Sequence, residues 1–151
     1  MAIILKKRIL RNIGIFLVAT VLFWGSTLPC FAAGCGSVAV TLEDKEKNKI
    51  TGATVHMCQI AELNRTDYYP TEAFEDSGIS MSGIINSPDE STAKTLLDYV
   101  MEKEIETLSA VSNDGSVLFE NLRLGIWLVY CDETSAYVFN PYIVFLPYKT
   151  E

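Results

Sequence analysis

The segment Asp114–Tyr130 reads DGSVLFENLRLGIWLVY, and it decides the fold class of this chain. Its first half alternates apolar and polar residues, as at Val117 and Phe119, which predicts a strand with one buried face. From Gly125 onward both alternating sets of residues are apolar, so this second strand is predicted to be covered on both faces. A strand covered on both faces belongs in the middle of a layered β protein.

Glycines and an Asn-Asp-Gly sequence punctuate these strands. Residues 113–115 form a tight-turn signal between predicted strands at 108–112 and 116–120. We therefore expect Asp114, Gly115 and Gly125 to be structural turn residues. Gly125 is expected to have a positive φ or to lie against a neighbouring strand, because glycine has no Cβ.

Further strands are predicted toward both ends of the chain. Residues 37–42 (SVAVTL) alternate, and after a polar turn residues 53–61 (ATVHMCQIA) form a second strand, so the two are expected to pair as a hairpin. The last strand is predicted at 136–146 (AYVFNPYIVFL). Pro141 cannot donate a hydrogen bond to a strand ladder, which places a bulge or a sheet edge there.

A helical insert is predicted at about 70–107, between the two groups of strands. The sequence Ser87-Pro88-Asp89-Glu90 has serine at the helix cap, proline at the first helical position and glutamate at the third, which is typical of a capping box. The apolar residues that follow, at spacings of three and four, predict one buried stripe. This stripe comprises Ala93, Leu96, Leu97, Val100, Met101, Ile105 and Leu108.

Together these elements predict a mainly β fold, an immunoglobulin-like β-sandwich of roughly six or seven strands with a helical insert. Residues 36–148 are expected to form one such domain. The most regularly patterned apolar positions are predicted to lie in its core. They are Leu96, Phe119, Leu124, Ile126, Leu128 and Val144.

Residues 1–33 read as a signal peptide. Four basic residues among the first eleven precede an apolar run at 13–24, and small residues around Ala33 suit a signal peptidase. The run is shorter than the about 20 residues of a spanning helix. The sequence therefore predicts a secreted protein with cleavage near Ala33.

Without this leader, 8 Lys+Arg face 19 Asp+Glu, a net charge of −11. Phosphate binding needs a concentrated cationic face, so we expect no nucleic-acid partner. Membrane contact is expected only through the leader or a lipid anchor.

Three cysteines follow the leader, an odd number for an oxidising compartment. One interpretation pairs Cys58 with Cys131 in a disulfide and leaves Cys35 near the mature end. Ala32-Ala33-Gly34-Cys35 loosely matches a bacterial lipobox, which makes Cys35 a candidate for lipidation. A disulfide that uses Cys35 and buried free thiols are the alternatives.

At this point the order of segments resembles the N-terminal domain of Gram-positive pilin subunits of the SpaA and collagen-adhesin B-type (CnaB) group. The resemblance runs from Gly36 to Pro147. It rests on GSVAVTL, GATVHMCQIAEL, YYPTEAFEDSGISMSGI, a helix ending in LLDYV, NDGSVLFENLRLGIWLVY and NPYIVFLP. That family implies a CnaB-like sandwich on a Gram-positive-type cell surface, in a structural, fimbrial or adhesive role. The implied partners are other surface or pilus subunits, or a host or matrix ligand.

The resemblance also implies an internal isopeptide bond between a lysine of the first strand and an asparagine of the last. Asn140 holds the asparagine position, but no lysine lies in residues 37–42, so we expect no such bond. The LPxTG sorting signal of the family is also not found at the end LPYKTE. The chain is thus expected to be a standalone secreted domain, a lipid-tethered module, or a fragment of a longer sortase-anchored protein.

We expect no enzymatic activity, no cofactor and no metal. His56 is the sole histidine and lies within a predicted strand, and no nucleophile motif, metal-spaced cluster or phosphate loop is found. One alternative function remains, a secreted carbohydrate-binding or Ca²⁺-binding module. It would use the carboxylates of Asp67, Glu72, Glu75 and Asp76 around the aromatic pair Tyr68-Tyr69.

Overall fold

The computed structural model describes residues 34–133 and 136–147. The predicted signal peptide at 1–33 and the end of the predicted domain at Tyr148 lie outside these residues. Seven strands and three helices form the described part. They are β1 (Cys35–Thr41), β2 (Thr54–Asn64), β3 (Asp67–Pro70), η1 (Glu72–Phe74), α2 (Met81–Asn86), α3 (Glu90–Glu102), β4 (Leu108–Val111), β5 (Ser116–Arg123), β6 (Gly125–Cys131) and β7 (Tyr142–Leu146).

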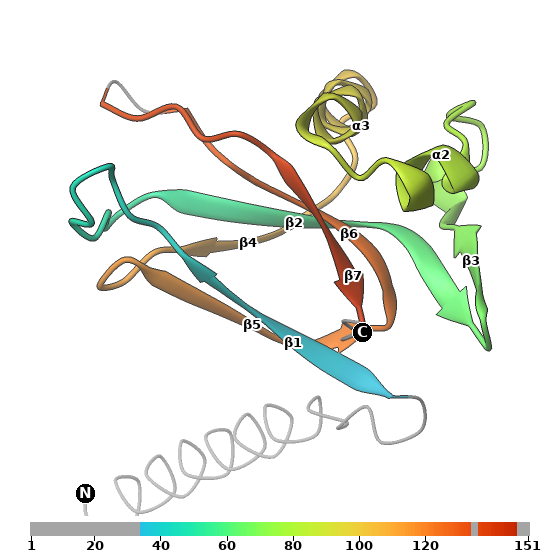
Figure 1. The fold of residues 1–151 in the computed structure, drawn as a ribbon, viewed down its shortest axis with the longest axis horizontal. Coiled ribbons are helices and arrows are strands. Elements are labelled where there is room, and N and C mark those ends of the chain that lie inside the picture. The colour runs from blue at the N-terminus through green and yellow to red at the C-terminus, as the bar shows by residue number, and fades with distance from the viewer. Residues whose placement is uncertain (1–33, 134–135, 148–151) are drawn as a thin grey trace, which may run out of the picture. The chain divides into compact units, whose positions relative to one another are not determined.

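All strand pairs are antiparallel and form two sheets. One sheet contains β1 and β5, and the other has the order β3-β2-β6-β7 with β4 also paired to β2. The five-stranded sheet lies between the β1–β5 pair on one face and the helices on the other (Figure 1). The predicted mainly β sandwich is confirmed, and the helices lie between Pro70 and Leu108.

Strand β6 runs through the middle of this arrangement, between β2 and β7. Trp127 and Val129 pack toward the β1–β5 pair, whereas Ile126 and Leu128 pack toward the helices. Six of its seven residues are buried. The doubly apolar pattern from Gly125 onward is therefore the signature of a strand enclosed between two layers.

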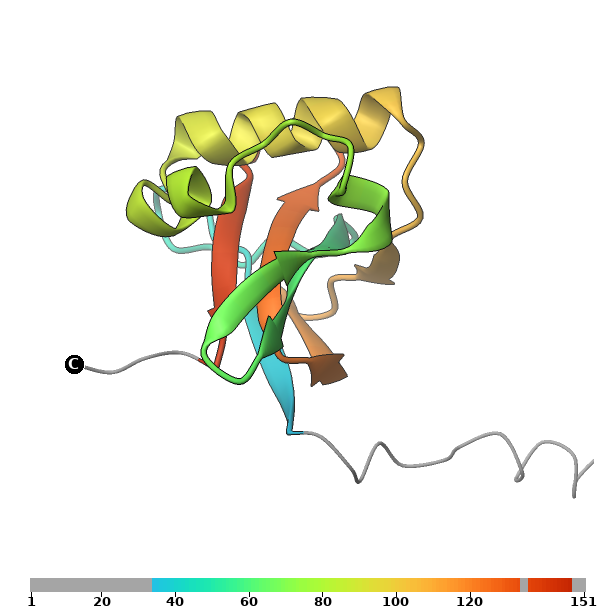
Figure 2. The same ribbon diagram turned by 90° about the vertical axis from the view of Figure 1, so that its right-hand side faces the viewer.

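The chain changes sheets between β5 and β6, and Gly125 makes this change possible. Its φ of +155° is one that residues other than glycine rarely adopt. A Cβ at this position would collide with the carbonyl oxygen of Ala61 on the neighbouring strand β2. Figure 2 shows β5 and β6 (both orange) on either side of this bend. The close strand contact expected for Gly125 is thus present. The residue lies where the chain passes from one sheet to the other, and not in a tight turn.

The turn before β5 has the geometry that its Asn-Asp-Gly sequence predicts. Asp114 and Gly115 have φ values of 49° and 71°, and backbone hydrogen bonds of 3.0 and 2.9 Å join Asn113 to Ser116 in both directions. Positive φ at both central residues is the condition for a tight hairpin turn. Beyond it the strands separate, because β4 pairs with β2 and β5 pairs with β1.

The predicted hairpin of residues 37–42 with 53–61 is wrong, since β1 pairs with β5 and not with β2. The polar turn does fold back on itself, with Ile50 N–H donating to the carbonyl of Leu42 at 2.9 Å. Both of these side chains are buried between the two sheets. The connection therefore carries the chain from one sheet to the other.

The cap of helix α3 lies two residues later than predicted. Asp89 is the N-cap and accepts the backbone N–H of Thr92 at 2.9 Å, while Ser87 ends helix α2. The hydroxyl of Ser87 donates instead to Asp89. The buried stripe is also shorter than predicted, because Met101 and Leu108 are exposed.

The last strand likewise starts later than predicted, at Tyr142 rather than at residue 136. Pro141 precedes it directly, and β7 forms an edge of the five-stranded sheet. The predicted core positions Leu96, Ile126 and Leu128 have no exposed surface. Phe119 is buried, and Leu124 and Val144 are partly buried against the core.

Candidate functional site

Cys58 and Cys131 lie in neighbouring strands, but on opposite faces of the sheet. Cys131 pairs with Val55, three residues from Cys58 along β2, and packs toward the β1–β5 pair. Cys58 pairs with Leu128 and packs toward the helices. Three residues of strand span about 10 Å, which exceeds the Cα separation that a disulfide spans. Both are free thiols, and the predicted disulfide between them is wrong.

Burial disfavours the ionised, reactive form of both thiols, although Cys131 is only partly buried. It raises the pKa of Cys58 to about 11. It likewise raises the pKa of Cys131 to about 11, with a further contribution from the nearby carboxylate of Asp132. Because the thiolate is the reactive form, these two cysteines act as small core residues.

Cys35, the candidate lipidation residue, is the first residue of β1 and pairs with Arg123 of β5. It lies at the point where the described domain begins. Lipidation there stays a prediction.

The residues of an internal isopeptide bond are not assembled in the described part of the chain. Asn140 is exposed and lies outside β7. The inward-facing positions of β1 are Val38 and Val40, and Lys45 is exposed in the loop after β1. Bond formation needs a buried, neutral lysine beside the asparagine, and this geometry does not supply one.

The acidic residues around Tyr68 and Tyr69 do not converge on a common site. Asp67 and both tyrosines belong to the edge strand β3, whereas Glu72 begins η1. Within residues 34–133 and 136–147, no group of three or more carboxylate, histidine or cysteine side chains could hold a metal ion. The predicted Ca²⁺-binding or sugar-binding loop therefore gains no support here.

His56 is part of a polar cluster that sequence reasoning missed. Its Nε2 lies 2.9 Å from Oδ1 of Asp132, and its Nδ1 lies 3.3 Å from the hydroxyl oxygen of Thr107. The ring stacks on Tyr130 with centroids 4.8 Å apart and planes inclined by 12°. Burial raises the pKa of Tyr130, while a hydrogen bond to Thr107 acts in the opposite direction. These contacts join β2, the end of β6 and the segment before β4.

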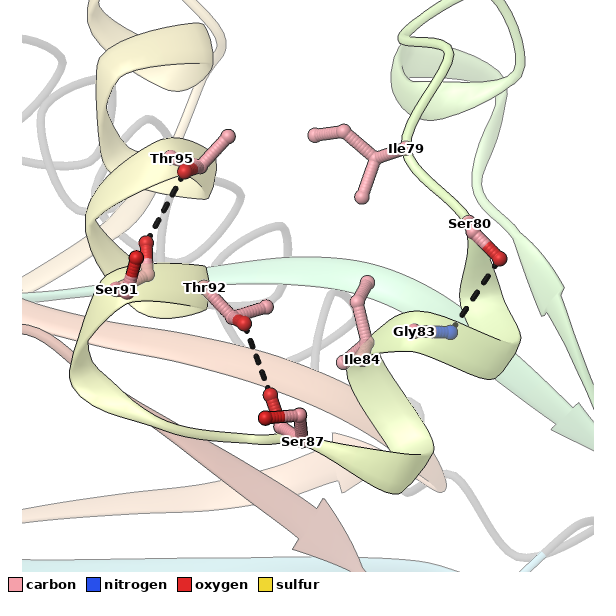
Figure 3. A pocket seen from close by; sticks show the side chains of 8 residues that line it. All are labelled: Ile79, Ser80, Gly83, Ile84, Ser87, Ser91, Thr92 and Thr95. Carbon is pink, nitrogen blue, oxygen red and sulfur yellow. Dashed lines mark hydrogen bonds between the residues drawn. The ribbon is translucent and has the colours of Figure 1, made fainter.

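A hydroxyl-lined pocket of about 320 Å³ lies between α2 and α3 (Figure 3). The hydroxyl of Thr92 donates to the carbonyl of Ser87 at 2.8 Å, and that of Thr95 donates to Ser91 at 3.0 Å. Ser80 accepts the backbone N–H of Gly83. The lining of the pocket includes Ile79 and Ile84 but no aromatic side chain. These hydroxyl bonds stay within the two helices and the link between them, so they stabilise that link.

A larger groove, the loop-end groove, has a volume of about 450 Å³ and lies between two loops. The loop between β1 and β2 contributes Glu43, Lys45 and Glu46, and the segment before β7 contributes Tyr137, Val138 and Phe139. Val138 is 76% exposed and Tyr137 is 38% exposed. No sequence pattern predicted this groove, because its two sides are about 90 residues apart in the chain.

The loop-end groove and the ends of the domain lie at opposite ends of the sandwich. One loop follows the last residue of β1 and the other precedes the first residue of β7. At the other end, a Cβ on Gly36 would lie 3.2 Å from Leu146, so the start of β1 and the end of β7 are in contact. Figure 1 shows both loops at the left and the end of the described chain at the lower right.

Comparison with known proteins gives few matches. No family model and no curated protein sequence matches this chain. Among solved structures, it is similar to the full-length major pilin SpaD from Corynebacterium diphtheriae, with a TM-score of 0.45 and 19% sequence identity over 78% of this chain. The chain spans 26% of the length of that pilin chain. Of the residues described, none forms a helix with the length and apolar character that a membrane crossing requires.

Proposed function

We propose that this protein is a secreted or cell-surface module with a structural or adhesive role, similar to a domain of a Gram-positive pilin subunit. One observation carries the proposal. The domain brings the start of β1 and the end of β7 together, with Gly36 against Leu146, and presents its loops at the opposite end. This geometry suits a domain attached at one end and exposed to partners at the other.

The sequence supports the same role. Residues 1–33 have the pattern of an export signal. The negative net charge of the rest of the chain favours its solubility in the aqueous medium outside the cell. We propose that the module binds other surface subunits or a host or matrix ligand, without enzymatic activity. In this proposal the contacts of the His56 cluster hold neighbouring strands together, Cys58 packs in the core, and Cys131 packs at its edge.

Surface display is tested by producing the full chain with its own leader in a Gram-positive host. Intact cells are treated with a membrane-impermeant amine reagent and with protease. We expect the chain to be modified and cleaved from outside, and its mass to show loss of the leader near Ala33. A chain that stays protected until the cells are lysed would contradict the proposal. The same mass measurement reports whether Cys35 carries a lipid.

A further inference from the structure

The loop-end groove combines aromatic, aliphatic and charged side chains in one concave surface. Tyr137 and Phe139 have ring centroids 6.2 Å apart and planes inclined by 38°, and Val138 stands between them in the chain. The loop on the other side of the groove contributes Glu43, Asp44 and Glu46, whose carboxylates are acceptors, and Lys45, whose ammonium group is a donor. A groove with an apolar wall and a few polar groups has the composition of a small-ligand site.

The polar side of the groove is held in shape by Asp44. Its Oδ1 accepts the backbone N–H groups of Glu46 and Asn48 at 2.8 Å each, and its Oδ2 accepts the Asn48 side chain at 2.9 Å. The hydrogen bond from the Asn48 side chain is the largest cause of the lowered pKa of Asp44. This carboxylate is thus occupied within the loop. Glu46 also accepts a hydrogen bond from the Asn48 side chain, at 3.4 Å. Glu43 and Lys45 are the other charged residues that line the groove.

These groups select among classes of ligand. An anionic ligand would be repelled, because the carboxylates that line the groove outnumber its one ammonium group, that of Lys45. A neutral ligand with several hydroxyl groups can donate to Glu43 and Glu46 and also accept from Lys45. A sugar ring has such hydroxyls at its edge and an apolar C–H face that can pack on Tyr137 and Val138.

We propose that the loop-end groove binds a neutral saccharide. The assignment rests on the proposed surface role and gives that role a ligand class. Recognition would take place at the end of the domain away from the start of β1 and the end of β7, where a glycan chain has room to approach.

Binding is measured by saturation-transfer difference NMR on the purified full chain. The neutral probes are cellotetraose, maltotetraose, chitotetraose and lactose, and the charged probes are tetralysine and tetragalacturonate. We expect transfer to at least one neutral probe, and none to tetragalacturonate. Transfer to tetralysine alone would replace the saccharide with a basic peptide, and no transfer to any neutral probe would overturn the proposal.

Variants locate the site. Tyr137→Ala should lower the affinity for the bound saccharide by about tenfold or more, a loss comparable to one strong aromatic contact, whereas Tyr137→Phe should retain binding. Tyr69→Ala is the matched control, because Tyr69 is also an exposed tyrosine, at 55%, but lies on β3. Equal binding by the Tyr137→Ala variant and the parent chain would exclude this groove.

A second pair of changes separates hydrogen bonding from charge. The double variant Glu43→Gln with Glu46→Gln keeps a carbonyl acceptor at each position and removes both negative charges. Saccharide binding should weaken but persist, whereas binding of a cation would fall much further, because only the carboxylate of Asp44 would remain in the groove. Because all these measurements use purified protein, a failure here leaves the cell-surface test of the proposed function intact, and the reverse also holds.

Discussion

Gly125 is the residue on which the change of sheet depends. We expect Gly125→Ala to destabilise the domain by about 1–3 kcal/mol or more, because a non-glycine residue is strained at this φ and its Cβ would also displace Ala61. Urea denaturation followed by circular dichroism measures the loss. Gly83→Ala is the control, since its Cβ would lie 3.5 Å from Ser80 in ordinary contact. Equal midpoints for Gly125→Ala and the parent would contradict this account of the bend.

The thiol of Cys58 should be nearly inert in the folded protein. With a pKa of about 11, on the order of 10⁻⁴ of it is ionised at pH 7. Iodoacetamide should therefore modify Cys58 slowly in buffer and rapidly in urea, as measured by peptide mass mapping. A Cys58–Cys131 peptide pair that separates only after reduction would show instead that the two are bonded.

At the scale of single elements, the cap of α3 gives stability that depends on pH. The backbone N–H of Thr92 is the largest cause of the lowered pKa of Asp89, followed by the hydroxyl of Ser87. A lowered folded-state pKa means that the carboxylate stabilises the fold fully above its ordinary pKa of 3.8. The stabilisation is lost as the pH falls from there through the folded-state value.

We therefore expect Asp89→Ala to lower Tm at neutral pH, and its deficit relative to the parent to shrink in acid. Asp89→Asn is the matched variant, since asparagine is about as good an N-cap residue as aspartate but does not titrate. Thermal melts across the acid range measure the difference. A deficit of Asp89→Ala that is the same at every pH would show that the charge contributes nothing.

The sequence predicts most elements of this fold, but not how they pair. Period-two patterns located β1, β2, β5 and β6, because each strand has its own buried face. The partner of β1 could not be read from its residues, since pairing with β5 joins segments about 80 residues apart. The cap of α3 was misplaced because both Ser87 and Asp89 are suitable caps, and only the end of α2 at Ser87 decides between them. The loop-end groove and the His56 cluster were missed for the same reason, since each brings together residues that lie far apart in the chain.

At the scale of the whole molecule, the doubly covered sheet should dominate stability. Leu128 has no exposed surface and packs toward the helices. We expect Leu128→Ala to cost about 2–5 kcal/mol in free energy of unfolding, measured by urea denaturation. Leu118→Ala removes the same atoms from a side chain that is 57% exposed on β5, and should change stability by about 0.5 kcal/mol or less. Similar losses for both variants would show that the burial of Leu128 against the helices contributes little to the free energy of unfolding.

The contact of Gly36 with Leu146 also has a mechanical consequence. Tension applied at Cys35 and Pro147 would pull apart two neighbouring strand ends, so the hydrogen bonds of β1 with β5 and of β7 with β6 would break one after another. Tension applied at Lys47 and Pro147 would act along the length of the sandwich and load many of these bonds together. Optical-tweezer experiments with handles at these two pairs of residues should give the lower unfolding force for the first pair, and the opposite order would refute the argument. A domain that unzips easily from the start of β1 and the end of β7 would suit the proposed surface role at a position outside the line of tension.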